Sequence, residues 1–416
     1  VALAAAAAIS PAAFAGDISW KGDANVEGFM YDQDEMEKVA GYSSRIRLAG
    51  SAKTDGNVSV NFRLLLNNST WSGDDHATVQ GAYELTGSDP VAVDYGYIQM
   101  PVAGWTVRVG RQVANWAGCF ITCNENRDRL LAMKRFGSTT LVLINDKRIE
   151  GDIAVEDDES DMYAVAGIGM YKGWLWGALL ATWQGDLQGK LNGNVLFSPY
   201  IKGKAAGLEI EGGFAYLGGA DEGSLYDGDT YQDAGSGLSG FVRLGKDFGQ
   251  VKLEGVAVMT KSGGLIDTGF NFYSMTLNNN PKAGASNVNY MAQNGYSGAL
   301  GAFSGPIGRN LGTGIAYAGT LGGEIAAGAD GEYVLAAKVS GKVAEGLTLS
   351  GAAGIANQDA GYDVETDYTF INVQASYQLA KTTEVYAGVE SLSVENDALN
   401  QERDAVAGTV GVNTTF

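Results

Sequence analysis

Short segments in which apolar residues alternate with small or polar ones recur along most of the chain, and this period-two pattern limits the fold more than any other feature. In the segment 42–53, Ile46 and Leu48 fall on one face, and Arg45 and Arg47 fall on the other. Strands with one apolar and one wet face show this pattern. The other candidate strands are 18–31, 58–67, 93–100, 105–111, 130–136, 139–145, 162–172, 174–183, 195–202, 208–217, 238–246, 251–260, 333–343, 347–355, 368–379, 384–391 and 405–416. These segments make about 18 candidates, and we expect two or more of them to be wrong.

The composition and charge narrow the class of protein. A helical membrane protein is excluded, because no stretch approaches the ~20 consecutive apolar residues that a spanning helix needs. The chain holds 60 glycines in 416 residues, about twice the usual share. The net charge of −20 argues against a nucleic-acid partner, because phosphates need a basic surface.

The connections between candidate strands alternate in length. Lys172-Gly173 and Glu345-Gly346 are typical of tight turns. Acidic residues concentrate in the long connections, at 32–37, 156–161, 221–233 and 395–404. Outer-membrane barrels combine short periplasmic turns with long external loops. The region 265–331 shows little alternation, and there we expect one long loop and an irregular hairpin.

The first residues, 1–15, are uncharged and end in the small-residue triplet Ala13-Phe14-Ala15. This is typical of a secretory signal peptide, here truncated at its start, with cleavage after Ala15. We expect residues 16–416 to form a single barrel domain. Because an exported chain meets an oxidising compartment, Cys119 and Cys123 are candidates for a local disulfide.

The last candidate strand carries Val410, Val412 and Phe416 on one face. It resembles the closing strand and terminal phenylalanine of outer-membrane barrel proteins, which the barrel-insertion machinery reads. We therefore predict an all-β, transmembrane antiparallel barrel of about 16 strands, within a range of about 14 to 18. The predicted location is the outer membrane of a Gram-negative bacterium, in contact with its lipid.

The stretch 105–146 carries the most specific motif. A candidate strand ends in Gly110-Arg111-Gln112 and is followed by the polar segment 113–128. In order and spacing this resembles the general diffusion porins of Gram-negative bacteria. The resemblance implies that 113–128 is a constriction loop folded into the pore, with Glu125 and Asp128 on its acidic side. It also implies a homotrimer that lets small hydrophilic solutes and ions diffuse passively.

Several basic residues have the lumen-side parity of their strands and form a candidate ladder opposite that loop. Its members are Arg45, Arg47, Arg63, Arg108 and Lys134. A charge on the lipid face costs ~2 to 4 kcal/mol at the midplane, so we expect these side chains to point inward. Two roles remain open: a transverse field that favours anions at the narrowest ring, or bracing of the wall by pairing with inward carboxylates.

Other functions stay as alternatives. A substrate-specific channel would show aromatic residues along the lumen, and Tyr95 and Tyr97 are the one hint of this. A barrel adhesin would use the long acidic loops. A barrel hydrolase needs a base, for which the chain offers only His76, so we expect no enzyme.

We expect no resident cofactor. The loop carboxylates Asp227, Asp229 and Asp233 are a weak calcium candidate, because hard cations favour several carboxylate oxygens. The run lacks the full spacing of a calcium loop, so a solvated external loop is the plainer interpretation.

Overall fold

The computed structural model describes residues 18–34, 38–54, 56–70, 91–150, 159–184, 193, 195–218, 225–227, 230–232, 237–261, 270–276, 331–359, 365–396 and 401–416. The described residues form an 18-stranded antiparallel sheet and a separate two-stranded one. The described part of the chain contains no helix that is long and apolar enough to cross a membrane. The signal segment 1–15 lies outside the described residues.

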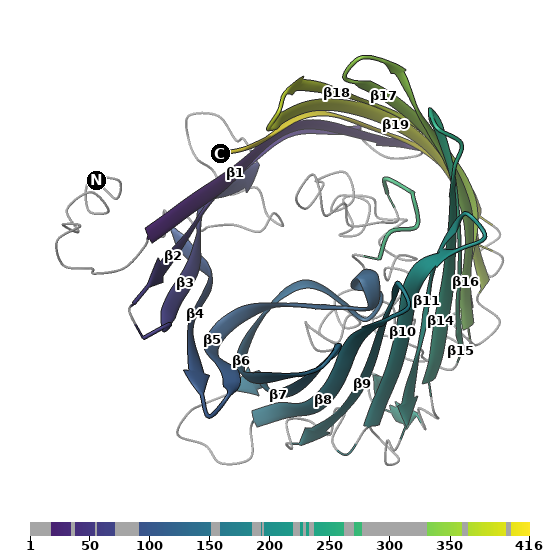
Figure 1. Ribbon diagram of the computed structural model, residues 1–416. Helices are drawn as coiled ribbons and strands as arrows, with labels where there is room; N and C mark the ends of the chain where they lie inside the picture. The colour runs from purple at the N-terminus through teal and green to yellow at the C-terminus, as the bar shows by residue number, and fades with distance from the viewer. Residues whose placement is uncertain are drawn as a thin grey trace.

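The large sheet closes on itself into a barrel (Figure 1). Each wall strand pairs with its neighbours in the chain, and β1 also pairs with β20, from Asp23 opposite Thr415 to Gln33 opposite Ala405. The wall strands are β1 Ile18–Gln33, β2 Val39–Lys53, β3 Ser59–Thr70, β4 Ala92–Val102, β5 Trp105–Trp116, β6 Thr122–Phe136, β7 Thr139–Glu150, β8 Glu159–Tyr171, β9 Trp174–Gln184, β10 Val195–Ala205, β11 Leu208–Gly218, β14 Gly237–Asp247, β15 Val251–Lys261, β16 Gly331–Ala344, β17 Leu347–Asp359, β18 Glu365–Ala380, β19 Thr383–Asn396 and β20 Gln401–Thr415. Closure pairs the first described wall strand with the last, as a lipid environment requires.

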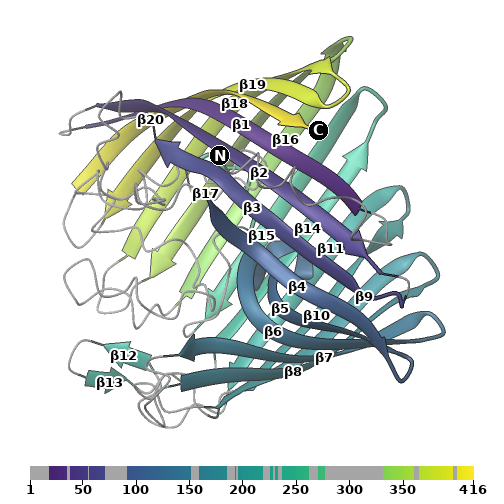
Figure 2. The same ribbon diagram turned by 90° about the vertical axis from the view of Figure 1, so that its left-hand side faces the viewer.

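The predicted all-β antiparallel barrel is confirmed, but the expected number of about 16 strands is wrong: the wall has 18 strands. Each of the candidate segments lies in a different wall strand, so discounting two of them was the error. The short pair β12 Leu225–Asp227 and β13 Thr230–Gln232 forms its own sheet and adds nothing to the wall (Figure 2).

The outer face of the wall is apolar. Side chains such as Leu335, Ile371 and Val410 are about half exposed or more and alternate with inward positions along their strands. At the seam between β1 and β20, the backbone of Phe416 exchanges two hydrogen bonds with Gly22, and its ring occupies the space that a Cβ on Gly22 would need. An outward apolar band suits the hydrocarbon of a bilayer.

One stretch of the inner face is also apolar, which the alternation alone does not predict. Many inner positions of β8 to β11 carry small or apolar side chains that are at most 8% exposed, beside the buried polar Ser198 and Glu211, and we call the apolar set the covered wall. It comprises Met162, Ala166, Leu179, Ala181, Trp183, Leu196, Ala215 and Leu217. Because these side chains are shielded inside a hollow barrel, another part of the chain must lie against them.

Candidate functional site

The hairpin formed by the ends of β5 and β6 lies against this side of the barrel, where the Trp116 ring packs over Gly177 of β9. The two strands pair with each other as far as Trp116 opposite Thr122. However, β5 pairs with β4 only as far as Arg111, and β6 pairs with β7 only from Asp128 onward. Beyond these residues the hairpin leaves the wall and bends into the barrel (Figure 1). We call residues 112–127 the inserted hairpin.

The predicted constriction loop 113–128 therefore lies inside the barrel, and most of it is strand where an irregular polar loop was expected. Its tip is a short 3-10 turn, η2 Ala117–Cys119. More exposed residues alternate with the buried Gln112 and Ala114, so the segment has the pattern of a strand with one covered face. Whether it limits permeation stays a proposal.

The tip of the inserted hairpin reaches strands far along the barrel. The Trp116 indole nitrogen donates to Ser198 Oγ on β10 at 3.0 Å. The Phe120 ring is fully buried, and its centroid lies 4.6 Å from that of Phe241 on β14. Gly118 has a φ of +64°, and an added Cβ would lie 2.3 Å from Glu211 Oε1 on β11. The positive φ favours glycine, and the tip backbone lies against the Glu211 carboxylate of the wall.

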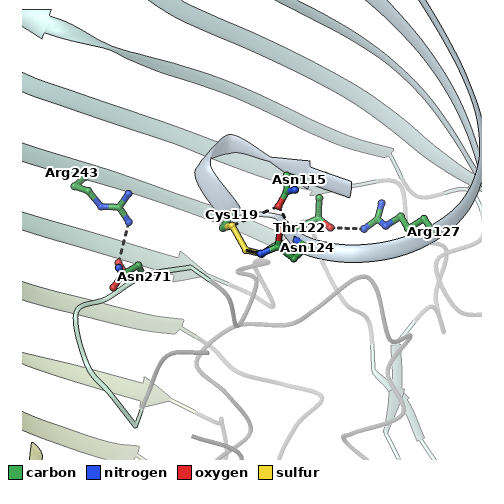
Figure 3. The surroundings of a disulfide bond; sticks show 8 residues. Asn115, Cys119, Thr122, Asn124, Arg127, Arg243 and Asn271 are labelled. Carbon is green, nitrogen blue, oxygen red and sulfur yellow. Dashed lines mark hydrogen bonds between the residues drawn. A yellow bond between two sulfur atoms is a disulfide. The ribbon is translucent and has the colours of Figure 1, made fainter. Parts of the chain in front are cut away.

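A disulfide joins Cys119 to Cys123 across the tip (Figure 3). Beside it, the Asn124 backbone N–H donates to Asn115 Oδ1 at 2.8 Å. The bond closes a loop with a sequence separation of 4, so it fixes the turn that presents Phe120 to the wall.

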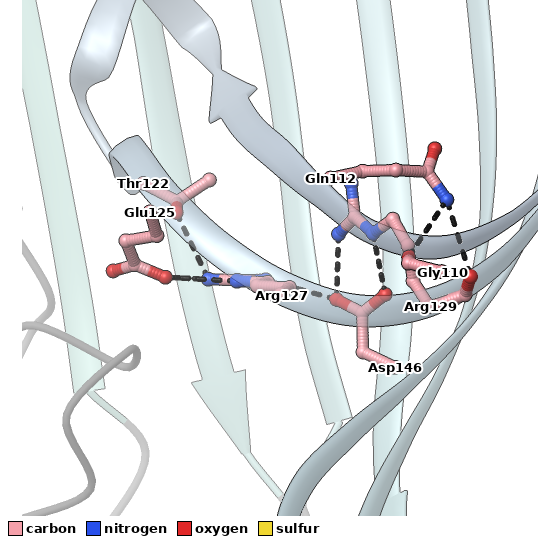
Figure 4. A network of polar contacts seen from close by, with 7 residues as sticks. All are labelled: Gly110, Gln112, Thr122, Glu125, Arg127, Arg129 and Asp146. Atoms are coloured by element: carbon pink, nitrogen blue, oxygen red, sulfur yellow. Dashed lines mark hydrogen bonds and ion pairs between the residues drawn. The ribbon is translucent and has the colours of Figure 1, made fainter. Parts of the chain in front are cut away.

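At the root of the hairpin, buried charges tie it to β7 (Figure 4). Arg129 donates to both carboxylate oxygens of Asp146, at 2.7 and 2.6 Å, and Arg127 reaches the same carboxylate at 3.3 Å. Arg127 also pairs with Glu125. The Asp146 side chain is 0% exposed. Buried charges persist only when they are paired in this way, so this cluster anchors the hairpin.

A second described segment, 270–276, also lies inside the barrel. Arg243 on β14 donates to the Asn271 backbone oxygen at 3.0 Å and to Glu211 at 3.1 Å. The Phe270 ring stacks edge-on to Phe120, with centroids 5.3 Å apart. The two inward segments therefore touch each other (Figure 3 shows Arg243 and Asn271 beside the hairpin tip).

On the inner face of β2 to β5, guanidinium groups and tyrosine rings alternate. Arg63 lies 4.7 Å above the Tyr95 ring, Tyr95 and Tyr97 have centroids 6.0 Å apart, and Arg108 lies 5.3 Å above Tyr97. Cation–π contacts of this kind align the charged and aromatic groups. We call the set Arg47, Arg63, Tyr95, Tyr97 and Arg108 the arginine–tyrosine ladder.

The ladder is partly neutralised by carboxylates. Arg47 pairs with Asp23 at 2.9 Å, and Arg63 pairs with Asp94 at 2.5 Å. Asp94 also accepts a hydrogen bond from Asn126 of the inserted hairpin at 2.6 Å. The ladder is therefore connected to the free face of the hairpin, the face that does not touch the covered wall.

The structure brings Arg45, Arg47, Arg63 and Arg108 to one inner surface, but it does not bring Lys134 there. Leu131 on β6 is buried inside the barrel, so Lys134, three residues further on, points outward. Its ammonium group lies near the rings of Trp105 and Phe136, beside a turn. A long lysine at a strand end can reach interfacial water in this way.

The two acidic residues expected on the constriction lie in different surroundings. Glu125 is paired with Arg127 beneath the hairpin and does not face the ladder. Asp128 is 63% exposed and lies 3.7 Å from Arg111. The alternation rule missed Arg127, Arg129, Asp146, Glu211, Arg243 and Glu390. Their signal was present as charges at inward parity within strands, where lipid exposure would be costly.

Other expected sites lie outside the description. His76, Asp229 and Asp233 fall on residues that the structure does not describe, and for Asp227 only the backbone is described. Within the described ranges, no group of His, Cys, Asp and Glu is arranged to hold a metal ion.

Comparison with known proteins is informative only at the level of structure. No protein-family model and no curated protein sequence matches the chain. The crystal structure of OccK1 (OpdK) from Pseudomonas aeruginosa is similar, with a TM-score of 0.54 and 10% identity, over 96% of this chain and 99% of that one. OccK11 (OpdR) from the same organism gives 0.56 and 10%, over 95% and 96%. The outer membrane protein OprD, also from that organism, gives 0.54 and 11%, over 95% and 94%.

These likenesses establish the fold of a porin-type outer-membrane barrel. They do not single out the general diffusion porins, so the resemblance to that family is supported only at this coarser level. The closed barrel and its apolar outer face agree with the predicted location in the outer membrane of a Gram-negative bacterium.

Proposed function

We propose that the protein is a substrate-selective outer-membrane channel for small organic anions, rather than a general diffusion porin. The observation that carries the proposal is the arginine–tyrosine ladder on β2 to β5, connected through Asp94 and Asn126 to a hairpin folded into the barrel. Both elements point into the barrel, where a passing solute would meet them.

The ladder suits anions for an electrostatic reason. An anion near Arg47, Arg63 and Arg108 exchanges part of its hydration shell for charge-assisted hydrogen bonds. Asp23 and Asp94 offset part of this positive charge, so binding stays weak enough for the anion to leave. This keeps both roles that the sequence left open, because the same arginines pair with the wall and face the lumen.

The tyrosines favour an aromatic or otherwise flat anion. Tyr95 and Tyr97 place two rings side by side between Arg63 and Arg108. A solute that has both a ring and a carboxylate would stack its ring on the tyrosines and pair its carboxylate with the arginines. One of the similar solved structures, OpdK, was crystallised with vanillate, which is such a molecule.

The experiment is conductance of the purified protein in a planar bilayer under a salt gradient, followed by permeation of benzoate against benzyl alcohol in liposomes. We expect a reversal potential that favours anions and faster entry of benzoate. Conductance steps in threes would support the homotrimer that the resemblance implied. A cation-favouring potential, or equal entry of the two solutes, would count against selectivity. No conductance at all from heat-modifiable, folded protein would rule out the channel.

The ladder has a matched test. Replacing Arg63 and Arg108 by glutamine keeps the side-chain length close to that of arginine but removes both charges. We expect benzoate entry to fall toward that of benzyl alcohol. Arg135 lies at an exposed turn, where it donates to the Gly137 backbone oxygen. The same substitution there should leave both rates unchanged.

A further inference from the structure

Glu390 on β19 holds the segment 270–276 against the wall by an unusually complete set of hydrogen bonds. Its Oε1 accepts from the Ser274 hydroxyl at 2.8 Å, the Thr276 backbone N–H at 2.9 Å and the Thr276 hydroxyl. Its Oε2 accepts from the Met275 backbone N–H at 2.6 Å and from Asn372 at 2.9 Å. The carboxylate is fully buried, so these donors together stabilise its charge away from water.

The other end of the same segment meets the inserted hairpin. Phe270 packs against both Phe120 of the hairpin tip and Phe241 of β14, with centroid distances of 5.3 and 4.7 Å, and the three rings form a triangle because Phe120 and Phe241 are also in contact. Arg243 stacks on Phe270 at 4.8 Å and bonds to Asn271. The ring of Phe120 is completely buried in this cluster. Segment 270–276 thus connects the hydrogen bonds at Glu390 to the tip of the hairpin.

The two ends of the hairpin are held differently. Its root has the buried ion pairs of Arg127 and Arg129 with Asp146. Its tip is held by the Trp116 bond to Ser198 and by the packing of Phe120 on one ring of segment 270–276, Phe270, and one ring of β14, Phe241. A change in the position of Phe270 would therefore be felt first at the tip.

We infer that Glu390 is a positioning residue for the inserted hairpin, acting through segment 270–276, so that the two inward segments move as one docked unit. The hairpin grows from β5 and β6, whereas Glu390 lies on β19, on another part of the barrel wall (Figure 1). The coupling is a property of the fold, and only its effect on permeation rests on the proposed function.

Hydrogen exchange measured by mass spectrometry on the full-length barrel tests the coupling without requiring a channel. The Phe120 backbone N–H donates to the Trp116 oxygen at 3.1 Å, and the Asn124 N–H donates to Asn115, so both report on the tip. Glu390→Gln places an amide N–H₂ where acceptors are needed. We expect exchange in a peptide covering 117–124 to rise about threefold or more.

A control variant and a variant without the contact between the two segments make the result specific. Glu395→Gln, at an exposed position of the same strand, should leave tip exchange at the wild-type rate. Phe120→Ala removes the contact between the hairpin tip and segment 270–276. In that background Glu390→Gln should raise exchange in 270–276 but should not raise it further at the tip. If Glu390→Gln frees 270–276 while the tip keeps its wild-type exchange, the inference is wrong.

A gentler pair of substitutions covers the case in which Glu390→Gln fails to fold. Ser274→Ala and Thr276→Val remove two donors and leave the wall intact, and together they should raise tip exchange in the same direction. In a bilayer, the same variants should increase current noise if the proposed function holds. A quiet, wild-type current with raised tip exchange would keep the coupling and count against the hairpin as the constriction. Unchanged tip exchange in the double variant overturns the coupling.

Discussion

The ladder surface on β2 to β5 and the covered wall on β8 to β11 are both inner faces of one barrel, yet they differ completely in chemistry. The first carries guanidinium groups, tyrosine rings and carboxylates that are partly exposed. The second carries side chains such as Leu179, Ala181 and Leu196 that are nearly inaccessible. Their outer faces are alike, because both meet lipid. What a lumen-facing residue touches, water or protein, therefore decides its polarity, and the strand position alone does not.

The largest expected difference between the two surfaces concerns their carboxylates. Asp146→Ala removes a fully buried partner of Arg127 and Arg129 and should lower the free energy of unfolding by about 3–5 kcal/mol. Asp23→Ala removes the partner of Arg47 on the ladder surface, where the side chains stay 21% and 32% exposed, and should cost at most about 1 kcal/mol. Denaturant unfolding in lipid vesicles measures both. Equal losses of unfolding free energy would mean that water reaches the ion pairs at the hairpin root.

The disulfide should matter next, and only on the covered side. Replacing Cys119 and Cys123 by serine frees a short loop and should destabilise the tip by about 2 kcal/mol. Faster hydrogen exchange at residues 115–124 would report it, and a mild reductant on the wild-type protein should reproduce it. The reversal potential, which the ladder sets, should not change. A shifted potential would show that the tip contributes to selectivity directly.

Charge reversal on the ladder should do the opposite, changing selectivity more than stability. Arg63→Glu alters the field felt by a passing ion by about 1 kcal/mol, because the site is close to water. We expect the anion preference measured from the reversal potential to fall roughly fivefold. The loss of unfolding free energy should be smaller than for Asp146→Ala, because the Arg63–Asp94 pair is partly exposed. Arg135→Glu at the exposed turn is the control. An unaltered potential in Arg63→Glu would leave the arginines as wall braces only.

The smallest expected effect is that of a single ring. Tyr97→Leu removes the face beneath Arg108 and should weaken benzoate binding by about 0.5–1 kcal/mol. The concentration of benzoate that halves the chloride current measures this. Tyr171, which is 64% exposed on the outer side of a turn, offers a matched substitution that should have no effect. If both variants behave alike, the rings do not contact the solute.

The same contrast explains how far the sequence could be read. Each wall strand was present among the candidate segments, most of them through the alternation that an apolar outer face imposes. The ladder arginines followed from the same rule, since a guanidinium cannot remain on that face. Lys134 was misplaced because a long side chain at a strand end escapes the rule by reaching the interface.

The covered wall could not be predicted from local pattern. In β9, both faces are apolar, as Leu180 on the outside and Leu179 on the inside show, so alternation disappears where the hairpin lies. That burial depends on contacts between residues far apart in the chain, such as Phe120 with Phe241. For the same reason the sequence showed that residues 146 and 390 are acidic, but it did not show that Asp146 and Glu390 hold other segments in place.

The covered wall also changes what it would mean to engineer a wider pore. Deleting the inserted hairpin would be expected simply to widen the pore. It would instead expose a strip of leucine, alanine and tryptophan side chains to the water inside the barrel. Exposing an apolar side chain the size of leucine costs about 1.5–3 kcal/mol. The trimmed barrel would thus be wider and yet less stable, unless the strip were made polar at the same time.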